Sequence, residues 1–242
     1  MECVRLLGVS EYEEDAQQRM DSELLLRFLT PLCKMYTAKC AVFCASEGIE
    51  CLGGIGYLET TNMPRIWRDA QVLPVWEGTT NVLSLDVLRV INHGHTGKRT
   101  MDLYYQRMEG IMERNGWYGK NRGDTMRLKE QIGILKEFME RFGGNRKLCA
   151  LFARDIAYSF CRVYAAAMLY EHAISSQQGE DMKVFRQFVN GDVQSSFVSG
   201  DCGKCLVSQS LINLMQNKCA DNEYEERAKF VRSMGMGSYS KL

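Results

Sequence analysis

The sequence predicts an all-α protein, and three observations lead to this fold class. Only three prolines occur in 242 residues, so few positions interrupt a helix. Runs in which apolar and polar residues alternate with many β-branched side chains, as strands require, are scarce. Apolar residues instead recur at helical spacing, most clearly in residues 32–52 and 146–175. A chain of this length can bury a sizeable core, in one large domain or two small ones.

The first part of the chain leads into its most apolar segment. Residues 1–20 are polar and short on periodicity, so we expect a frayed start. Helical spacing predicts a helix over residues 24–32. Thr30 and Pro31 favour a new helical entry, with Thr30 as N-cap and Pro31 at the first position, where its missing N–H costs nothing. Residues 32–52 are apolar on nearly all sides, which is typical of a helix buried at the centre of a bundle.

A glycine-rich loop region follows and leads to a second helix. We expect Gly53 and Gly54 to end the preceding helix as a left-handed C-cap. Thr79 or Thr80 can cap the next helix, which closes at residues 92–94. The loop region therefore lies between two apolar helices, where functional side chains are commonly found.

The rest of the chain continues as further helices. We predict them over residues 101–112, 125–142, 146–175, 181–189, 204–216 and 221–234. Thr125 would cap the second of these and Asp221 the last. The sequence becomes rich in Gly, Arg and Asn after residue 95. This change favours a domain boundary, with a helical bundle over residues 1–95 and a helical C-terminal extension over residues 96–242.

Composition and charge argue against several classes of function. Thirty basic residues balance thirty acidic ones, so no net field favours nucleic acid or an anionic membrane as partner. No run of about eighteen apolar residues occurs, so we expect no membrane span. The absence of a signal peptide favours an intracellular protein with reduced thiols. Early acidic residues do not fit a mitochondrial presequence, and the choice between a mitochondrial and a cytoplasmic location stays open.

The ten cysteines and three histidines do not predict a metal site. Most cysteines lie in apolar helical segments, where a thiol behaves as a small hydrophobic group. Cys202 and Cys205, with Cys219 nearby, can be read as half a zinc site, as a redox pair or as incidental loop thiols. No histidine follows His172 and no βαβ pattern surrounds the pair, so we favour incidental thiols. The histidines lack the spacing of a triad or a metal site, which favours solvent positions at helix ends.

Residues 50–89 concentrate the features that can carry chemistry. A glycine triplet tolerates positive φ and lets other atoms approach the backbone closely. Glu77 places a carboxylate between Trp76 and Gly78. Taken alone, such a glutamate is most often a surface carboxylate. The glycine triplet is equally typical of a helix stop, and it is not a dinucleotide fingerprint because a helix, not a strand, precedes it.

Three motifs follow one another in this stretch. They are Glu50-Cys51-Leu52-Gly53-Gly54-Ile55-Gly56-Tyr57, Arg65-Ile66-Trp67-Arg68-Asp69-Ala70 and Glu77-Gly78-Thr79-Thr80-Asn81. Together they resemble the C-terminal helical domain of acyl-CoA dehydrogenases, an antiparallel four-helix bundle in that family. Thr30-Pro31 with Lys34, and residues 85–89, look most like the branch that includes the bacterial alkylation-response flavoproteins. The resemblance covers about residues 24–91.

The resemblance implies flavin-dependent α,β-dehydrogenation of an acyl-CoA thioester. Glu77 matches the family's base, a carboxylate that removes the α proton in a water-poor pocket, which the preceding tryptophan would help to keep dry. The Gly53-Gly54 backbone would contact the adenine-nucleotide half of FAD, held mainly by a neighbouring subunit. Thr79 and Asn81 would contact the cofactor through donors at the start of their helix.

The chain also departs from the family pattern. The glycine motif starts at residue 53, so we expect the family's N-terminal domain, its middle β-domain and the first bundle helices to be absent from this chain. Arg68 and Asp69 are expected to form a structural pair that fixes the loop. Two hypotheses follow: a dehydrogenase portion whose other domains lie on a longer product, or a noncatalytic helical scaffold. Both predict self-association, because residues 32–52 and the unpartnered bundle faces would expose a large apolar patch.

Overall fold

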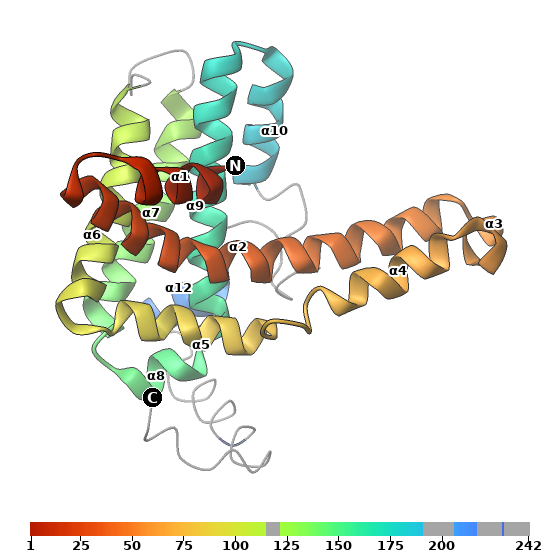
Figure 1. Ribbon diagram of the computed structural model, residues 1–242, viewed down its shortest axis with the longest axis horizontal. Coiled ribbons are helices and arrows are strands. Elements are labelled where there is room, and N and C mark those ends of the chain that lie inside the picture. Colours follow the sequence, from red (N-terminus) through yellow and green to blue (C-terminus); the bar gives the residue numbers. More distant parts are fainter. Residues whose placement is uncertain (115–121, 191–205, 217–228, 230–242) are drawn as a thin grey trace.

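The computed structural model describes residues 1–114, 122–190, 206–216 and 229, and within them every regular element is a helix (Figure 1). The predicted all-α fold class is therefore confirmed. In chain order the elements are α1 (Glu2–Tyr12), α2 (Ala16–Cys51), α3 (Gly54–Tyr57), the 3-10 turn η1 (Glu59–Thr61), α4 (Met63–Val72), α5 (Thr80–Ile91), α6 (Gly94–Arg114), α7 (Arg122–Phe142), α8 (Arg146–Leu151), α9 (Ala153–Ser176), α10 (Gly179–Asn190) and α12 (Gln209–Met215).

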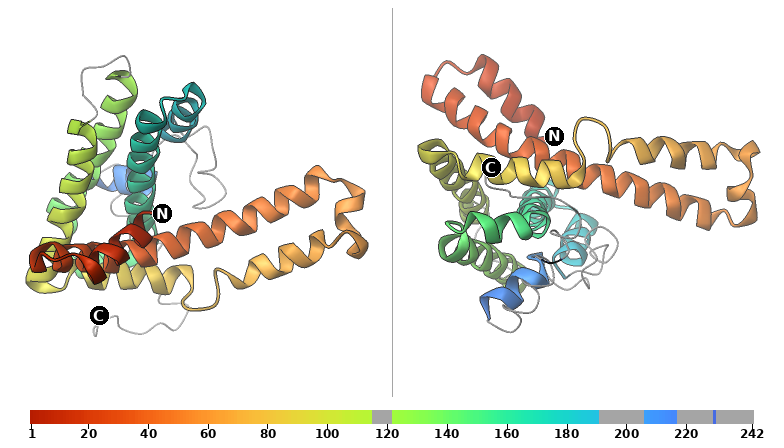
Figure 2. Two further views of the ribbon diagram at one scale, coloured as in Figure 1. Left: turned by 45° about the horizontal axis from the view of Figure 1, so that its top comes forward. Right: turned by 90° about the horizontal axis from the view of Figure 1, so that it is seen from below.

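The helices form a body and an arm. In the body, α9 packs against α5, α7 and α10, while α1 lies along the first half of α2 (Figure 2). The second half of α2 leaves the body, and α4 returns beside it in the opposite direction. We call residues 40–72 the arm; α3 and η1 form its tip.

The core of the body is centred on α9. Phe28 of α2, Tyr104 of α6 and Phe160 of α9 meet edge to face, with ring centroids 5.2 to 5.5 Å apart. The Tyr104 hydroxyl donates to the Phe160 carbonyl oxygen at 2.8 Å, so its polar end is satisfied inside the core. Elements from both sides of residue 95 contribute to this core. The division into two domains at that position stays a prediction.

The start of the chain differs from the sequence prediction. Residues 1–20 are not a frayed segment, because α1 buries Leu6 against α2 to 2% exposure. Helix α2 begins after Asp15, whose carboxylate accepts two backbone N–H bonds, and runs unbroken through Pro31. Thr30 is therefore not an N-cap; its hydroxyl donates back to the Leu26 carbonyl oxygen at 2.8 Å. An interior proline costs about 3 kcal/mol, which the burial of α2 in the core offsets.

The second half of α2 is not buried at the centre of a bundle as predicted. It forms one side of the arm, and α4 is the element that packs along it. Large apolar side chains at the tip and along the arm stay exposed, among them Leu52 at 50%, Ile55 at 63% and Trp67 at 37%. Residues 32–52 are indeed rich in apolar side chains. Within the described residues, however, one antiparallel helix, α4, covers one side of the second half of α2.

Most later elements follow the predictions, with shifted ends. Helix α6 is longer than expected, and α7 begins before Thr125, which is inside the helix rather than at its cap. The predicted helix over residues 146–175 is divided by the buried Phe152 into α8 and α9. Asn145 caps α8 by accepting from a backbone N–H. Of the helix predicted over residues 221–234, the structure describes only residue 229.

Membrane-spanning segments were not expected from the sequence. Within the ranges that the structure describes, no helix combines the length and apolar character needed to cross a bilayer.

Candidate functional site

The loop between α4 and α5 holds Glu77 in an unusual backbone conformation. Its φ is +53°, in the left-handed region, and Gly78 follows with φ +111°. A non-glycine residue in this region costs on the order of 1–2 kcal/mol, and such strain is concentrated at functional sites. The loop therefore holds the backbone of Glu77 in a conformation that a glutamate rarely adopts.

A lysine from α2 supports this loop. Lys34 Nζ donates to the carbonyl oxygen of Gly78 at 2.5 Å. Pro74 is buried at the other end of the loop. The sequence identified Lys34 only as part of a family resemblance and missed this role. The available signal was a cation in a largely apolar segment, although that segment also contains Lys39.

Glu77 is open to solvent in this chain. Both Glu77 and Trp76 are exposed, Trp76 at 54%. The expected water-poor pocket, with Trp76 as its cover, is therefore not formed by the described residues. The loop lies on the surface where the arm leaves the body, so a pocket at this place needs atoms from beyond these residues. The role of Glu77 as base stays a prediction.

The N-terminus of α5 follows directly after Glu77. Thr79 occupies the N-cap position as expected, but its side chain makes no capping hydrogen bond, and both Thr79 and Asn81 are exposed. Thr80, the alternative cap, is buried instead, and its carbonyl oxygen accepts from Ser84 Oγ at 2.8 Å. A helix start without a side-chain cap can offer backbone N–H groups to an anionic group.

The glycine triplet lies at the far end of the arm and divides into two kinds of glycine. Gly53 has φ +60° just after α2, so the helix stops there as predicted, although its conformation is not that of a left-handed helix. A Cβ placed on Gly53 or Gly54 would meet nothing within 4 Å. Gly56 is buried, and a Cβ there would lie 2.3 Å from the Ile49 carbonyl oxygen. Gly56 is therefore required for packing, whereas Gly53 and Gly54 leave their backbone open to an approaching group.

The structure separates the two sets of predicted cofactor residues. Gly53 and Gly54 lie at the tip of the arm, and Glu77, Thr79 and Asn81 lie at its base (Figure 1). The ten-residue α4 between them spans about 15 Å at 1.5 Å per residue. They do not form one compact site within this chain.

Arg68 and Asp69 do not pair with each other. Arg68 forms a bidentate bond with Glu59 of η1, at 2.8 and 3.1 Å, and Asp69 pairs with Arg65 at 3.7 Å. The predicted pair is wrong because adjacent residues on a helix point in different directions, whereas residues four apart lie on one face. The Arg68–Glu59 pair instead ties the tip of the arm to α4.

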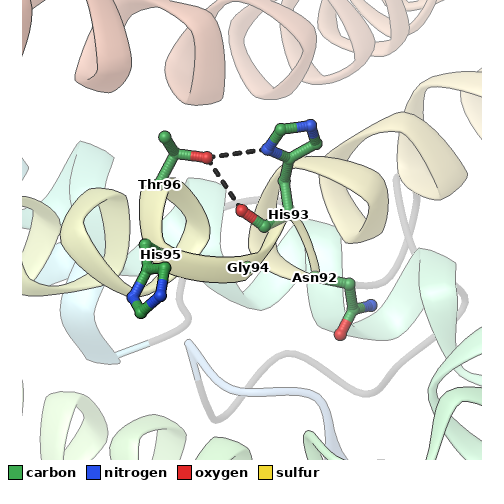
Figure 3. A pocket seen from close by; sticks show the side chains of 5 residues that line it. All are labelled: Asn92, His93, Gly94, His95 and Thr96. Carbon is green, nitrogen blue, oxygen red and sulfur yellow. Dashed lines mark hydrogen bonds between the residues drawn. The ribbon is translucent and has the colours of Figure 1, made fainter.

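A shallow hollow surrounds the turn between α5 and α6. It has a volume of about 420 Å³ and is lined by residues 92–96 (Figure 3). The Thr96 hydroxyl donates to the His93 carbonyl oxygen at 2.8 Å, and His93 Nδ1 lies 2.8 Å from the same hydroxyl oxygen. The hollow lies at the opposite end of α5 from Glu77.

The described residues contain no group of three or more His, Cys, Asp or Glu side chains that could hold a metal ion. The Cys202–Cys205 pair and Cys219, which the sequence favoured as incidental thiols, lie outside the described residues.

Comparison with known proteins assigns both halves of the chain. A family model for the acyl-CoA dehydrogenase C-terminal domain matches residues 4–92, and a model for an acyl-CoA dehydrogenase 11 C-terminal domain-like region matches residues 99–204. The likeness thus extends well beyond residues 24–91, where the motifs were found. The extension had no motif of this kind to reveal it.

Individual relatives agree with these matches. Acyl-CoA dehydrogenase family member 11 of Caenorhabditis elegans is 40% identical over 189 residues, which are 72% of this chain and 28% of that protein. The putative acyl-CoA dehydrogenase AidB of Escherichia coli is 44% identical over 69 residues, or 28% of this chain and 13% of AidB. The crystal structure of C. elegans ACDH-11 in complex with C11-CoA superposes with a TM-score of 0.70 and 29% identity, covering 91% of this chain and 37% of that one.

The chain thus spans less than two fifths of the length of each of these relatives. Two adjacent family models, an identity of 40% and a shared fold all point the same way. This chain belongs to the acyl-CoA dehydrogenase family and corresponds to its C-terminal helical part.

Proposed function

We propose that this chain is the C-terminal portion of a flavin-dependent enzyme that dehydrogenates an acyl-CoA thioester between its α and β carbons, with Glu77 as the base. The observation that carries the proposal is the Glu77 loop: a family motif, held at φ +53° and anchored by Lys34 through Gly78. A strained conformation that a second element supports is typical of a preorganised catalytic group.

In this proposal Glu77 Oε accepts the proton from the α carbon of the thioester. Lys34 keeps the loop in place, so the carboxylate does not have to be ordered when substrate binds. Closure of the exposed side of the loop by other parts of the enzyme would exclude water and so favour proton transfer from the α carbon to the carboxylate.

The residues proposed to hold FAD suit a shared site. Thr79 and Asn81 are exposed at the start of α5, and the backbone of Gly53 and Gly54 is open at the tip of the arm. These two places lie at opposite ends of the arm, so one cofactor cannot lie compactly against both within one chain. This supports a site in which they contact two different flavins, or one flavin held between subunits. FAD, when bound, supplies acceptance of the β hydrogen as hydride, which leaves an enoyl thioester.

Self-association is part of the proposal. Exposed apolar side chains gather on the arm and the loop at its base, including Leu52, Ile55, Ile66, Val72 and Trp76. Such a collection is characteristic of a surface that another element covers. It also supports the second candidate function, a noncatalytic helical scaffold that keeps the family's interface without the chemistry.

A visible absorption spectrum of the purified chain, with and without added FAD, separates the two candidates. Flavin bands that co-migrate with the protein support the dehydrogenase, and acyl-CoA turnover is then measured directly. A colourless chain that ignores FAD, and yet self-associates in sedimentation, supports the scaffold.

Two variants test the residues. Glu77→Gln in a flavin-loaded form is expected to abolish dehydrogenation and to retain the cofactor; unchanged turnover would remove Glu77 as base. Gly54→Val is expected to weaken assembly or flavin retention. Because a Cβ at Gly54 meets nothing within 4 Å in this chain, such a loss would report on a partner or ligand rather than on folding.

A further inference from the structure

A pocket lies between the C-terminal half of α5 and the short helix α8, which pack against each other (Figure 1). Its volume of about 300 Å³ is at the lower end of the range for small-molecule sites. Leu85, Leu88 and Asn92 line it from one face of α5 and its C-cap, since residues three and four apart on a helix are neighbours. Ala150 lines it from α8, so much of the wall is apolar. We call this the α5–α8 pocket.

Two arginines bring positive charge to this pocket, Arg89 from α5 and Arg146 from α8. Asp86 is the acidic neighbour of Arg89, but its Oδ1 lies 3.9 Å from Arg89 Nη1, which is beyond hydrogen-bond distance. Both carboxylate oxygens of Asp86 instead accept from Arg27, each at 2.8 Å. The hydrogen bonds of this carboxylate therefore go to a guanidinium outside the pocket, and the N–H donors of Arg89 stay available.

Arg146 is also without a carboxylate. Among the residues that the structure describes, none forms an ion pair or a hydrogen bond with its side chain, and none of those that line the pocket is acidic. His93 completes the wall, and its Nδ1 lies 2.8 Å from the Thr96 hydroxyl oxygen, which fixes the ring. The pocket thus combines an apolar wall with two guanidinium groups that can each donate to an anion.

We propose that the α5–α8 pocket binds an amphipathic anion, whose aliphatic chain lies against Leu85, Leu88 and Ala150 and whose carboxylate or phosphate head is bound by Arg89 and Arg146. The inference does not depend on the proposed dehydrogenase activity. Helix α5 has 12 residues and spans about 18 Å, so its last turn, which carries Arg89, is far from the Glu77 loop. The ligand would be a second one, separate from the thioester substrate.

Both parts of such a ligand match the pocket. The planar fork of a guanidinium fits the oxygens of a carboxylate or a phosphate, and it does so in two parallel hydrogen bonds. A small hydrophilic anion would leave the leucine side chains in contact with water, which costs free energy in proportion to their apolar area. A neutral apolar molecule would leave two positive charges at the wall without a counterion. A molecule with both parts covers the apolar surface and neutralises the charges.

The test is isothermal titration calorimetry of the full 242-residue chain at pH 7, with octanoate and octyl phosphate as probes. We expect saturable binding at one site, and the tighter of the two probes identifies the head group. Octanol keeps the chain without the charge, and acetate keeps the charge without the chain. Each is expected to bind at least about tenfold more weakly than the preferred probe.

Substitutions locate the site. Arg89→Gln and Arg146→Gln should each raise the Kd of the preferred probe about tenfold, because hydrogen bonds to a charged head are lost. Lys147→Gln is the matched control, since it removes the same charge from the next residue of α8, which is also exposed and does not line the pocket. Its Kd should be unchanged. Ala150→Phe would fill the pocket and abolish binding. Arg146 is exposed, so Arg146→Gln retains the fold and tests the site even where Ala150→Phe does not fold.

Three results would each overturn the proposal. Absence of saturable binding at millimolar octanoate and octyl phosphate would show that the pocket takes no such ligand. Equal Kd values for the preferred probe and octanol would show that the guanidinium groups do not bind the head. Equal losses in Arg146→Gln and Lys147→Gln would assign the binding to the general charge of this surface.

Discussion

Replacement of Arg107 by Gln tests whether buried ion pairs hold α1 and α9 to α6. The guanidinium donates to both carboxylate oxygens of Glu171, at 3.1 and 2.8 Å, and to Glu2 at 3.1 Å. Its side chain is 16% exposed, against 13% for Glu2 and 29% for Glu171. The substitution would leave two carboxylates close together, with Arg5 as a remaining partner of Glu2.

The magnitude follows from the pKa of Glu2. Burial alone would raise it, but the hydrogen bonds and charges of Arg5 and Arg107 outweigh burial and lower the pKa from 4.5 to about 2. Lowering this pKa from 4.5 to about 2 corresponds to about 3.4 kcal/mol, to which both Arg5 and Arg107 contribute. The partly exposed pair with Glu171 adds about 1 kcal/mol. We therefore expect a loss of about 2–3 kcal/mol and a Tm lower by about 4–12 °C.

The pH dependence has a definite sign. Because the folded-state pKa of Glu2 is lowered, its contribution is fully present above pH 4.5 and is lost as the pH falls toward 2. The difference in Tm between the wild-type chain and Arg107→Gln, measured by circular dichroism, should therefore shrink between pH 5 and pH 3.

A matched control separates burial from bond geometry. Arg68 binds Glu59 with nearly the same distances as Arg107 binds Glu171. The side chains of Arg68 and Glu59, however, are 54% and 69% exposed. Exposed pairs contribute about 0–1 kcal/mol, so Arg68→Gln should change the Tm little. Equal losses in the two variants, or a loss for Arg107→Gln that stays constant down to pH 3, would refute the reasoning.

Three further predictions concern the arm and the loop at its base. Gly56→Ala should cost about 1–3 kcal/mol and speed amide hydrogen exchange in the arm, because its Cβ would lie 2.3 Å from the Ile49 carbonyl oxygen; Gly54→Ala, with open space, should not. Equal exchange in the two variants would contradict this account. Lys34→Met should cost about 1.5–3 kcal/mol and speed exchange in the loop, since a charge-assisted bond to the Gly78 carbonyl is lost; unchanged exchange there would show that the lysine does not support the loop. Gly78→Ala should lower the Tm, because φ +111° is strained for any residue with a Cβ, and a Tm at or above that of the wild-type chain would argue against the conformation.

Local patterns in the sequence predicted much of the secondary structure. Helical periodicity identified α5, α7 and α10 within a few residues, and the position of Thr79 marked the start of α5. Gly53 marked the end of α2, since its φ is positive. These features depend on residues within one or two turns of each other, so the sequence carries them without knowledge of the fold.

The sequence was misleading where a local signal competed with packing. Thr30-Pro31 is a good helix start by local rules, yet α2 continues through it because the surrounding helix is buried in the core. In the same way, the nearly all-round apolar character of residues 32–52 predicted a central helix. The structure sends its second half out as an arm.

The sequence by itself determined the fold class, the family motifs and the chemical groups at the site: the open glycines, the Glu77 carboxylate and the first residues of α5. Tertiary structure alone decided that the glycines and Glu77 lie at opposite ends of the arm, and that Lys34 reaches the Gly78 carbonyl oxygen. The physical reason is that periodicity and caps are properties of neighbouring residues. Which distant side chains come within bonding distance depends on the path of the whole chain and on the packing that holds it there.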